Sequence, residues 1–194
     1  DVLMAAGVQD AAAHVGLTGL DVVERGDKRF GFGGSLPVEK ALQPEVLLAD
    51  EMNGQPLTAL HGGPVRLVVP GYIGARSVKW LSEIELLAEP SANYFQAAAY
   101  RILREPDPAD PRDVRAGEAL GEVSLNAVIL APEHGSRLPA GEITVQGWAM
   151  DGRCRIRLVE LSTDGGCTWS RTELEDGEGR WTWQRWSAQV ALPP

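Results

Sequence analysis

The sequence predicts an α+β protein in two parts, a mixed unit of strands and short helices followed by a β-sandwich. From Val123 onward, short segments of alternating apolar and polar residues are separated by glycine-containing turns, which is typical of sandwiches. Before that point, Glu105–Asp113 places three prolines among acidic residues, a composition that indicates an extended linker. A chain of 194 residues can hold one or two domains with a real core. The predicted boundaries are 1–103, 104–122 and 123–194.

The first part is predicted to begin with a helix that Gly7 ends. Two short apolar runs within Ala12–Val23 predict a strand, a loop and a second strand. The glycines of Gly26–Ser35 predict a flexible loop, which lacks the G-x-G-x-x-G and G-K-[ST] patterns of nucleotide-binding loops. Ser35 is then placed to cap a short helix that continues through Ala41.

Short strands and one tight turn are predicted for the middle of the chain. Asn53-Gly54 is the strongest hairpin-turn pattern in the sequence. Buried strands are predicted at Val46–Ala49 and Val65–Val69, and a further strand at Ile84–Ala88. Tyr94–Leu103 is compatible with either a short helix or an extended arm.

The second part is predicted to be all β. Five segments have the required alternation: Val123–Leu130, Glu142–Met150, Arg155–Ser162, Thr168–Leu174 and Trp181–Val190. Five of the six tryptophans also lie here: Trp148, Trp169, Trp181, Trp183 and Trp186. Tryptophans in a sandwich could form a carbohydrate-stacking platform, but packing in a core or an interface is the favoured interpretation.

Composition excludes several classes of function. The chain has 18 Lys and Arg against 27 Asp and Glu, a net charge of −9, which disfavours nucleic-acid binding. No apolar run approaches membrane-spanning length, so no membrane contact is expected. Cys154 and Cys167 are too few for a disulfide scaffold, and two free, partly buried thiols are expected. No cluster of potential ligands has zinc-like spacing.

One basic stretch stands out from this acidic background. No Asp or Glu occurs between Met52 and Ser82, whereas four basic residues do, namely His61, Arg66, Arg76 and Lys79. Glycines around them allow backbone N–H groups to approach a ligand closely, and the planar fork of arginine matches phosphate oxygens. The pattern indicates an anion site, most plausibly for a phosphate group. The alternative is a hairpin whose basic side chains pair with acidic residues elsewhere.

The segment Glu45–Leu81 carries a series of specific motifs. An E-M-N-G turn is followed by H-G-x-P-x-R, by V-V-P-G and by G-A-R-x-V-K-W. With these motifs, the segment closely resembles the sulfite oxidase family of molybdenum-cofactor oxidoreductases. The sequence from about Val123 resembles the immunoglobulin-like dimerisation domain of the same family. The resemblance implies a partial molybdopterin-binding domain of mixed α/β structure, followed by a truncated immunoglobulin-like sandwich.

The resemblance also implies which residues bind the molybdenum-molybdopterin cofactor. Arg66 would fork onto the phosphate oxygens, and Lys79 would supply a point charge. His61 would contact phosphate or pterin, and Asp21 would accept N–H groups of the pterin ring. Ser77 and Val78 would contribute hydroxyl and backbone contacts.

Three departures from the family pattern bear on activity. The cysteine that binds molybdenum in this family is expected in sequence upstream of this chain, so no metal ligand is assigned within it. The position of an active-site tyrosine is Phe32, before Gly33-Gly34-Ser35-Leu36-Pro37. The position of a substrate-facing arginine is Leu158, in a segment otherwise similar to the family's. Both expected catalytic positions are therefore substituted.

The resulting functional expectation is part of a molybdopterin-dependent oxidoreductase that transfers an oxygen atom to or from a small oxo-species. The 194-residue chain alone is expected to be inactive. A small oxo-anion or oxide substrate, an electron acceptor such as a cytochrome, and a second copy in a homodimer are the expected partners. Two alternatives stay open: a nitrate-reducing member of the family, and a noncatalytic binding or assembly module built on the sandwich.

Overall fold

The structure is a computed structural model that describes residues 2–8, 11–103 and 117–193. It divides into two compact units, Asp1–Gly121 and Glu122–Pro194. Strands predominate among the described residues, and the helices are few and short. The predicted linker falls largely on residues 104–116, which lie outside the described residues.

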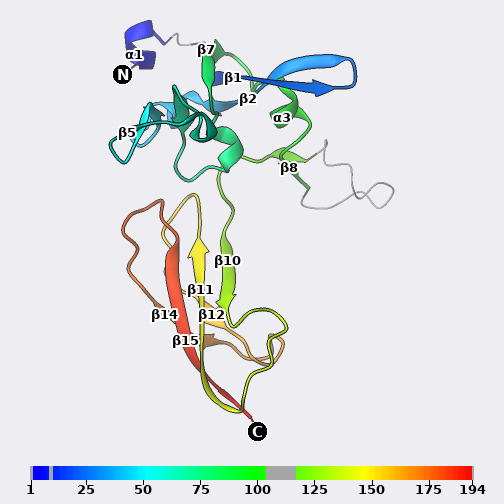
Figure 1. Cartoon of the computed structure of the whole chain (residues 1–194), viewed down its shortest axis with the longest axis vertical. Coiled ribbons are helices and arrows are strands. Elements are labelled where there is room, and N and C mark those ends of the chain that lie inside the picture. The colour runs from blue at the N-terminus through cyan, green and yellow to red at the C-terminus, as the bar shows by residue number, and fades with distance from the viewer. Residues whose placement is uncertain (1, 9–10, 104–116, 194) are drawn as a thin grey trace. The chain divides into compact units, whose positions relative to one another are not determined.

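The first unit is organised around a three-stranded antiparallel sheet in the order β2-β1-β7 (Figure 1). Smaller two-stranded pairings, β3 with β6, β4 with β5 and β8 with β9, surround it. The elements in chain order are α1 (Val2–Ala6), β1 (His14–Arg25), β2 (Lys28–Pro37), α2 (Val38–Ala41), β3 (Leu47–Ala49), β4 (Glu51–Met52), β5 (Gln55–Pro56), η1 (Ala59–His61), β6 (Arg66–Val68), η2 (Gly74–Arg76), β7 (Leu81–Leu87), α3 (Tyr94–Ala97), β8 (Arg101–Ile102) and β9 (Glu118–Ala119).

The long hairpin of β1 and β2 corrects two predictions. Residues 12–23 do not form two strands, because β1 is continuous; its pairing with β2 shifts between Thr18 and Val22, and its pairing with β7 shifts between Thr18 and Gly19. Residues 26–35 are not a flexible loop, because all but the turn at their start belong to β2. The glycines serve close packing instead: a Cβ on Gly33 would lie 2.4 Å from the Leu17 carbonyl oxygen. Glycine therefore allows this strand pairing rather than disrupting it.

Two further local predictions were wrong and two are confirmed. Ser35 does not cap α2; its buried Oγ accepts hydrogen bonds from the Ser91 N–H (2.9 Å) and from Gln96 Nε2 (3.0 Å). The strand at 46–49 begins at Leu47 and is not buried, since Leu47 is 53% exposed. The helix that Gly7 ends and the hairpin turn at Asn53-Gly54 are both present.

The core of the first unit joins the sheet to the basic stretch. Its buried apolar residues are Val15, Leu17, Leu36, Leu67, Val69 and Val78. Beside them lies Arg76, which is only 2% exposed. Its Nε and Nη2 donate to the Leu120 carbonyl (3.0 and 2.8 Å), and its Nη1 donates to the Phe95 carbonyl (3.4 Å). Burial lowers the pKa of Arg76, but the pKa of a free guanidinium is so high that the group stays charged.

The second unit contains a four-stranded antiparallel sheet in the order β10-β11-β15-β14, with a separate pair of β12 and β13 (Figure 1). The strands are β10 (Asn126–Ala131), β11 (Gly141–Met150), β12 (Glu160–Leu161), β13 (Ser170–Arg171), β14 (Glu173–Leu174) and β15 (Gln184–Leu192). The segment predicted as a strand at 155–162 is regular only over β12, and Arg157 and Leu158 before it are both exposed.

The core of this unit packs against one tryptophan. Trp186 is 2% exposed and lies among Val145, Ala149 and Val159. Gly147 makes room for it, because a Cβ there would lie 2.5 Å from the Trp186 ring. The tryptophans do not share one environment: Trp186 packs in the core, whereas Trp169 and Trp183 are 59% and 43% exposed, so for these two the predicted packing in an interface stays a prediction.

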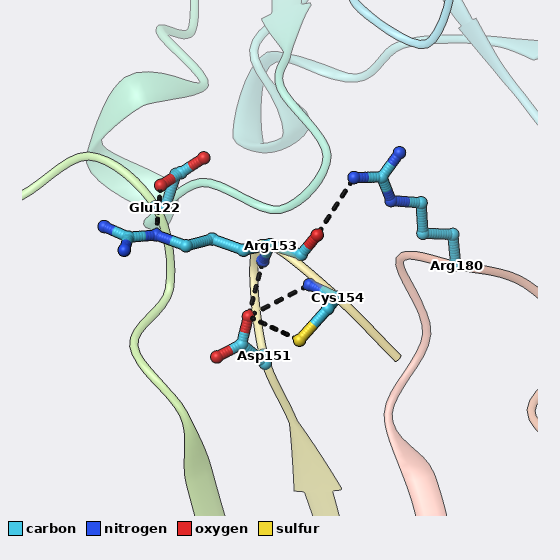
Figure 2. A network of polar contacts seen from close by, with 5 residues as sticks. All are labelled: Glu122, Asp151, Arg153, Cys154 and Arg180. Carbon is cyan, nitrogen blue, oxygen red and sulfur yellow. Dashed lines mark hydrogen bonds and ion pairs between the residues drawn. The ribbon is translucent and has the colours of Figure 1, made fainter. Parts of the chain in front are cut away.

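A polar turn follows β11 (Figure 2). Asp151 Oδ1 accepts the Arg153 and Cys154 N–H groups at 2.6 and 3.1 Å, and the Arg153 side chain pairs with Glu122. The Arg180 guanidinium donates to the Arg153 carbonyl at 2.9 Å. Both cysteines are free, as expected, but both are exposed rather than partly buried. The Cys154 Sγ is held beside Asp151 at 3.7 Å.

We expect Arg76→Ala to destabilise the first unit by about 3 kcal/mol, because two partly buried carbonyls would lose their donors. Urea unfolding followed by circular dichroism measures this. Arg29→Ala is the matched control, because that side chain is 72% exposed and its 4.0 Å contact with Glu24 should contribute less than about 0.5 kcal/mol. Equal effects of the two substitutions would contradict a structural role for Arg76.

In the turn at residues 162–169, we expect the Asp164 carboxylate to stay ionised at lower pH than an ordinary aspartate. Asp164 accepts hydrogen bonds from the Thr168 N–H (2.9 Å), Thr168 Oγ1 (2.7 Å) and Ser162 Oγ (2.8 Å), which lower the pKa of Asp164 to about 2 from 3.8. Because the folded-state pKa is the lower one, the stabilisation is complete above about pH 4 and is lost as the pH falls through about 2.

Carboxyl-carbon NMR titration measures this pKa directly. Thr168→Val is the informative variant, since it removes the Oγ1 donor and keeps the backbone N–H, and it should move the midpoint part of the way back. A parent midpoint near the ordinary value of 3.8 would refute the role of the turn.

Candidate functional site

The candidate site lies where the basic stretch folds back on itself. The loop that contains η1 meets the segment 77–80 through the Trp80 N–H, which donates to the Gly62 carbonyl at 3.1 Å. The same segment pairs with the β6 region, since the Leu67 N–H donates to the Val78 carbonyl at 2.8 Å. It also reaches β1, because the Leu20 N–H donates to the Trp80 carbonyl at 2.8 Å. Segments up to 60 positions apart in sequence therefore converge.

Arg66 is positioned by backbone carbonyls alone. Its Nη1 donates to the His61 carbonyl (3.0 Å), its Nη2 to the Ser77 carbonyl (3.2 Å) and its Nε to the Leu67 carbonyl (3.4 Å). These bonds use three of the five guanidinium N–H groups, so one on each terminal nitrogen stays available to a ligand. The side chain is half-buried, and these three hydrogen bonds fix its orientation.

Lys79 and His61 are held in a similar way. Lys79 Nζ donates to the Leu60 carbonyl at 3.0 Å and lies 4.5 Å from the centre of the Trp80 ring. Two of its three ammonium N–H groups remain available. The His61 Nδ1 lies 2.9 Å from the Thr58 hydroxyl, which orients the exposed ring and leaves Nε2 open.

The charges at this site are not compensated within the described parts of the chain. Neither Arg66 nor Lys79 has a carboxylate within 4.0 Å among those residues. The alternative in which the basic side chains of the hairpin pair with acidic residues therefore has no support in the part that the structure describes. Arg76, which the sequence also placed in this basic group, is buried on carbonyls and does not belong to the site.

Ser77 and Val78 offer little beyond their backbones. The Ser77 hydroxyl accepts the Val69 N–H at 3.0 Å, and the Val78 side chain is 1% exposed in the core. The N–H groups of Val78 and Lys79 have no acceptor among the described residues. Both N–H groups are therefore available to a ligand, which is compatible with the backbone contact predicted for Val78.

Asp21 brings a buried acceptor to the same place. Its Oδ1 is buried and has no hydrogen-bond partner among the described residues. A Cβ on Gly19 would lie 2.5 Å from this oxygen and 2.7 Å from the Lys79 carbonyl oxygen, so the carboxylate adjoins the Lys79 backbone. A buried carboxylate oxygen without a donor is costly, and a ligand N–H would remove that cost.

The two substituted catalytic positions lie in different units. The Phe32 carbonyl is also close to Gly19, but its ring packs on Phe95 with 4.4 Å between centroids and joins the core of the first unit. Leu158 belongs to the second unit, where it is 45% exposed. The structure thus brings together all six predicted cofactor residues, Asp21, His61, Arg66, Ser77, Val78 and Lys79, and describes Leu158 only within its own unit.

The sequence analysis gave no role to Thr58 or to Trp80. Thr58 orients His61, and Trp80 contacts two other converging segments, β1 and the loop that contains η1. Trp80 has φ 49°, a left-handed conformation that is rare for an aromatic residue. The sequence signal for Trp80 was its place as the last residue of the G-A-R-x-V-K-W motif, directly after Lys79.

Comparisons with known proteins agree with this arrangement. Residues 1–95 match the oxidoreductase molybdopterin binding domain, and residues 118–194 match the Mo-co oxidoreductase dimerisation domain. Mitochondrial sulfite oxidase from Macaca fascicularis is 39% identical over 100% of this chain and 36% of its own length. The chain belongs to the sulfite oxidase family. A nitrate reductase of Hordeum vulgare, 35% identical over 99% of this chain and 24% of its own length, is a more distant relative.

A solved structure supports the same family at the level of the fold. The sulfane dehydrogenase SoxCD from Paracoccus pantotrophus matches 98% of this chain and 46% of its own, with a TM-score of 0.78 and 27% identity. The chain spans about a third of the length of the sulfite oxidases that it matches. The six predicted cofactor residues lie within the range matched by the molybdopterin-binding family model.

Within residues 2–8, 11–103 and 117–193, no group of three or more His, Cys, Asp or Glu could hold a metal ion. None of the helices described in these ranges is long and apolar enough to cross a membrane.

Proposed function

We propose that the intact protein that contains this chain uses a molybdenum-molybdopterin cofactor to transfer an oxygen atom to or from a small oxo-species. The observation that carries the proposal is the convergence of His61 and the uncompensated Arg66 and Lys79 with the Asp21 carboxylate oxygen, which has no hydrogen-bond partner among the described residues. A ligand with both a phosphate and an N–H-rich ring would pair its phosphate with the cations and donate an N–H to the Asp21 carboxylate. When bound, the cofactor supplies the redox chemistry, and the protein binds and orients it.

Each residue of this chain has a distinct task in the proposal. Arg66 and Lys79 bind the terminal phosphate, and His61 adds a donor or acceptor through its open Nε2. Asp21 accepts an N–H of the pterin ring, which fixes the orientation of the ring. The Val78 N–H supplies a backbone donor, and Ser77 holds Val69 in place while retaining its own hydroxyl proton.

The metal ligand and the chain organisation form the second part of the proposal. We assign no metal ligand within this chain; a cysteine upstream would bind the molybdenum, so the 194-residue chain alone should not turn over. Residues 1–103 would be the C-terminal part of a mixed α/β molybdopterin-binding domain, 104–122 a linker, and 123–194 a truncated immunoglobulin-like sandwich through which the protein forms a homodimer. An electron acceptor such as a cytochrome would take electrons from the cofactor and so reoxidise it.

Two alternatives receive different support. A nitrate-reducing function is favoured by the similarity to a plant nitrate reductase, which is only slightly lower than that to sulfite oxidases. A noncatalytic module built on the sandwich would leave the uncompensated cations of the first unit without a purpose. We therefore keep the first alternative as the second candidate.

Arg66→Ala should weaken cofactor retention by about ten- to a hundredfold, because charge-assisted hydrogen bonds to the phosphate contribute roughly 1.5–3 kcal/mol. Arg66→Lys should restore only part, since the fork is lost. Molybdenum and pterin contents per chain of the purified intact protein, measured after gel filtration, test this.

Arg185→Ala is the control for that experiment. It removes an arginine of the second unit that is about half exposed, and it should leave cofactor content unchanged. Parent protein without molybdopterin would refute the proposed function. Full retention by Arg66→Ala would refute the assignment of the phosphate site.

The intact protein should oxidise sulfite poorly. Phe32 lacks the hydroxyl, and Leu158 the charge, that the family presents to this anion. Loss of a charged and a neutral hydrogen bond together corresponds to about two to three orders of magnitude in binding. The double variant Phe32→Tyr/Leu158→Arg should lower the KM for sulfite, which steady-state kinetics with an artificial electron acceptor would measure.

A less charged substrate, such as an organic oxide or a thio-compound, would suit the substituted site better. Each single variant serves as the control for the double variant, because Leu158→Arg alone should recover the larger share. Efficient oxidation of micromolar sulfite by the unmodified protein would refute this interpretation and would point to another source of positive charge.

A further inference from the structure

Trp80 makes four contacts in an unusual backbone conformation. It has φ 49°, a left-handed value that glycine adopts readily and that tryptophan adopts only when its surroundings enforce it. Its N–H donates to the Gly62 carbonyl (3.1 Å), its carbonyl accepts the Leu20 N–H (2.8 Å), and its indole Nε1–H donates to the Ala59 carbonyl (2.8 Å). These three hydrogen bonds hold Trp80 in its left-handed conformation.

These contacts join two separate segments to the one that contains Trp80. Leu20 precedes Asp21 in the irregular part of β1, while Ala59 and Gly62 flank His61 in and after η1. Lys79 adjoins Trp80 directly. Every segment that contributes a side-chain group to the proposed cofactor site, apart from Arg66, is thus joined through this one residue.

The indole also acts on the Lys79 ammonium. Lys79 Nζ lies 4.5 Å from the ring centroid, within the range of a cation–π contact. The stem of the lysine packs on Gly62, where a Cβ would lie only 2.7 Å from the Lys79 Cβ. The ring therefore limits Nζ to a position from which it donates to the Leu60 carbonyl and retains two further donors.

We propose that Trp80 is a positioning residue that assembles the cofactor site before the cofactor binds. This inference rests on the proposed function for the identity of the ligand. Trp80 is placed to act through the residues that it holds: it keeps Asp21, His61 and Lys79 in their binding geometry, so that ligand binding does not have to order these segments. The left-handed backbone turns the chain so that all four contacts can form together.

Two substitutions separate the roles of the indole and of the backbone. Trp80→Phe keeps a ring beneath Lys79 and loses the Nε1 donor. Trp80→Gly removes the ring but suits the left-handed backbone, so the two backbone hydrogen bonds are retained. We expect cofactor content of the intact protein, after a fixed period of gel filtration and dialysis, to fall about fivefold in Trp80→Phe, the factor for one lost neutral hydrogen bond. In Trp80→Gly it should fall about tenfold or more.

A second measurement does not depend on the cofactor. Hydrogen exchange of cofactor-free protein should show faster exchange at the Leu20 and Gly62 N–H groups in Trp80→Phe, by about the same fivefold, while N–H groups in the centre of β1 are unchanged. Thermal unfolding midpoints close to that of the parent would show that the substitution acts locally.

Trp169→Phe is the matched control. Trp169 also donates its indole Nε1–H to a carbonyl, that of Gly166 at 3.2 Å, but it lies in the second unit. Trp169→Phe should change neither cofactor content nor exchange at Leu20 and Gly62. Equal cofactor retention by Trp80→Phe and Trp169→Phe, or unchanged exchange in Trp80→Phe, would overturn the inference. Parent protein without cofactor would instead contradict the proposed function, and the exchange experiment would still test the positioning role.

Discussion

The first unit depends on a buried positive charge that is neutralised by no carboxylate among the residues described. The Arg76 guanidinium is surrounded by carbonyl oxygens of Leu120 and Phe95, and its Nη1 would lie 2.8 Å from a Cβ on Gly34. It therefore connects β2, α3 and the end of the unit. A buried guanidinium is stable only when its donors are occupied, so these three regions must assemble together or not at all.

This constraint extends directly to the candidate site. Arg76 immediately precedes Ser77, Val78 and Lys79, and fixing it fixes the starting point of that segment. The different roles of the basic residues follow from their surroundings: Arg76 donates its hydrogen bonds to carbonyls inside the unit, whereas Arg66 and Lys79 each retain free donors. The chain has a net charge of −9, so a site with uncompensated positive charge requires segments that contain no acidic residues. The sequence between Met52 and Ser82 is such a segment, because it contains no Asp or Glu.

Much of the site could be predicted from sequence, and the reasons are local. Motifs in which residue type and spacing both matter selected His61, Arg66 and Lys79, and the fold brings these residues together. The Asn-Gly pattern located the turn at Asn53-Gly54. The errors have a common cause. Glycine was interpreted as flexible at residues 31–34, where it instead permits close contact between β1 and its neighbours, which only tertiary structure reveals. Likewise, nothing in the sequence distinguished buried Arg76 from half-buried Arg66, because exposure depends on residues 95 and 120.

The glycines of the two sheets affect how natural variation in this protein should be interpreted. A methyl group on Gly33 would meet the Leu17 carbonyl oxygen at 2.4 Å, and one on Gly147 would meet the Val128 carbonyl oxygen at 1.9 Å. Neither position touches the candidate site, yet an alanine at either would require two strands to separate. A survey of inherited variants would find both positions intolerant of change and could mistake them for functional residues. An assay that measures protein abundance separately from catalytic rate would show that such variants lose abundance because they fold poorly. Substitutions at positions such as Arg66 would instead keep normal abundance and lose activity.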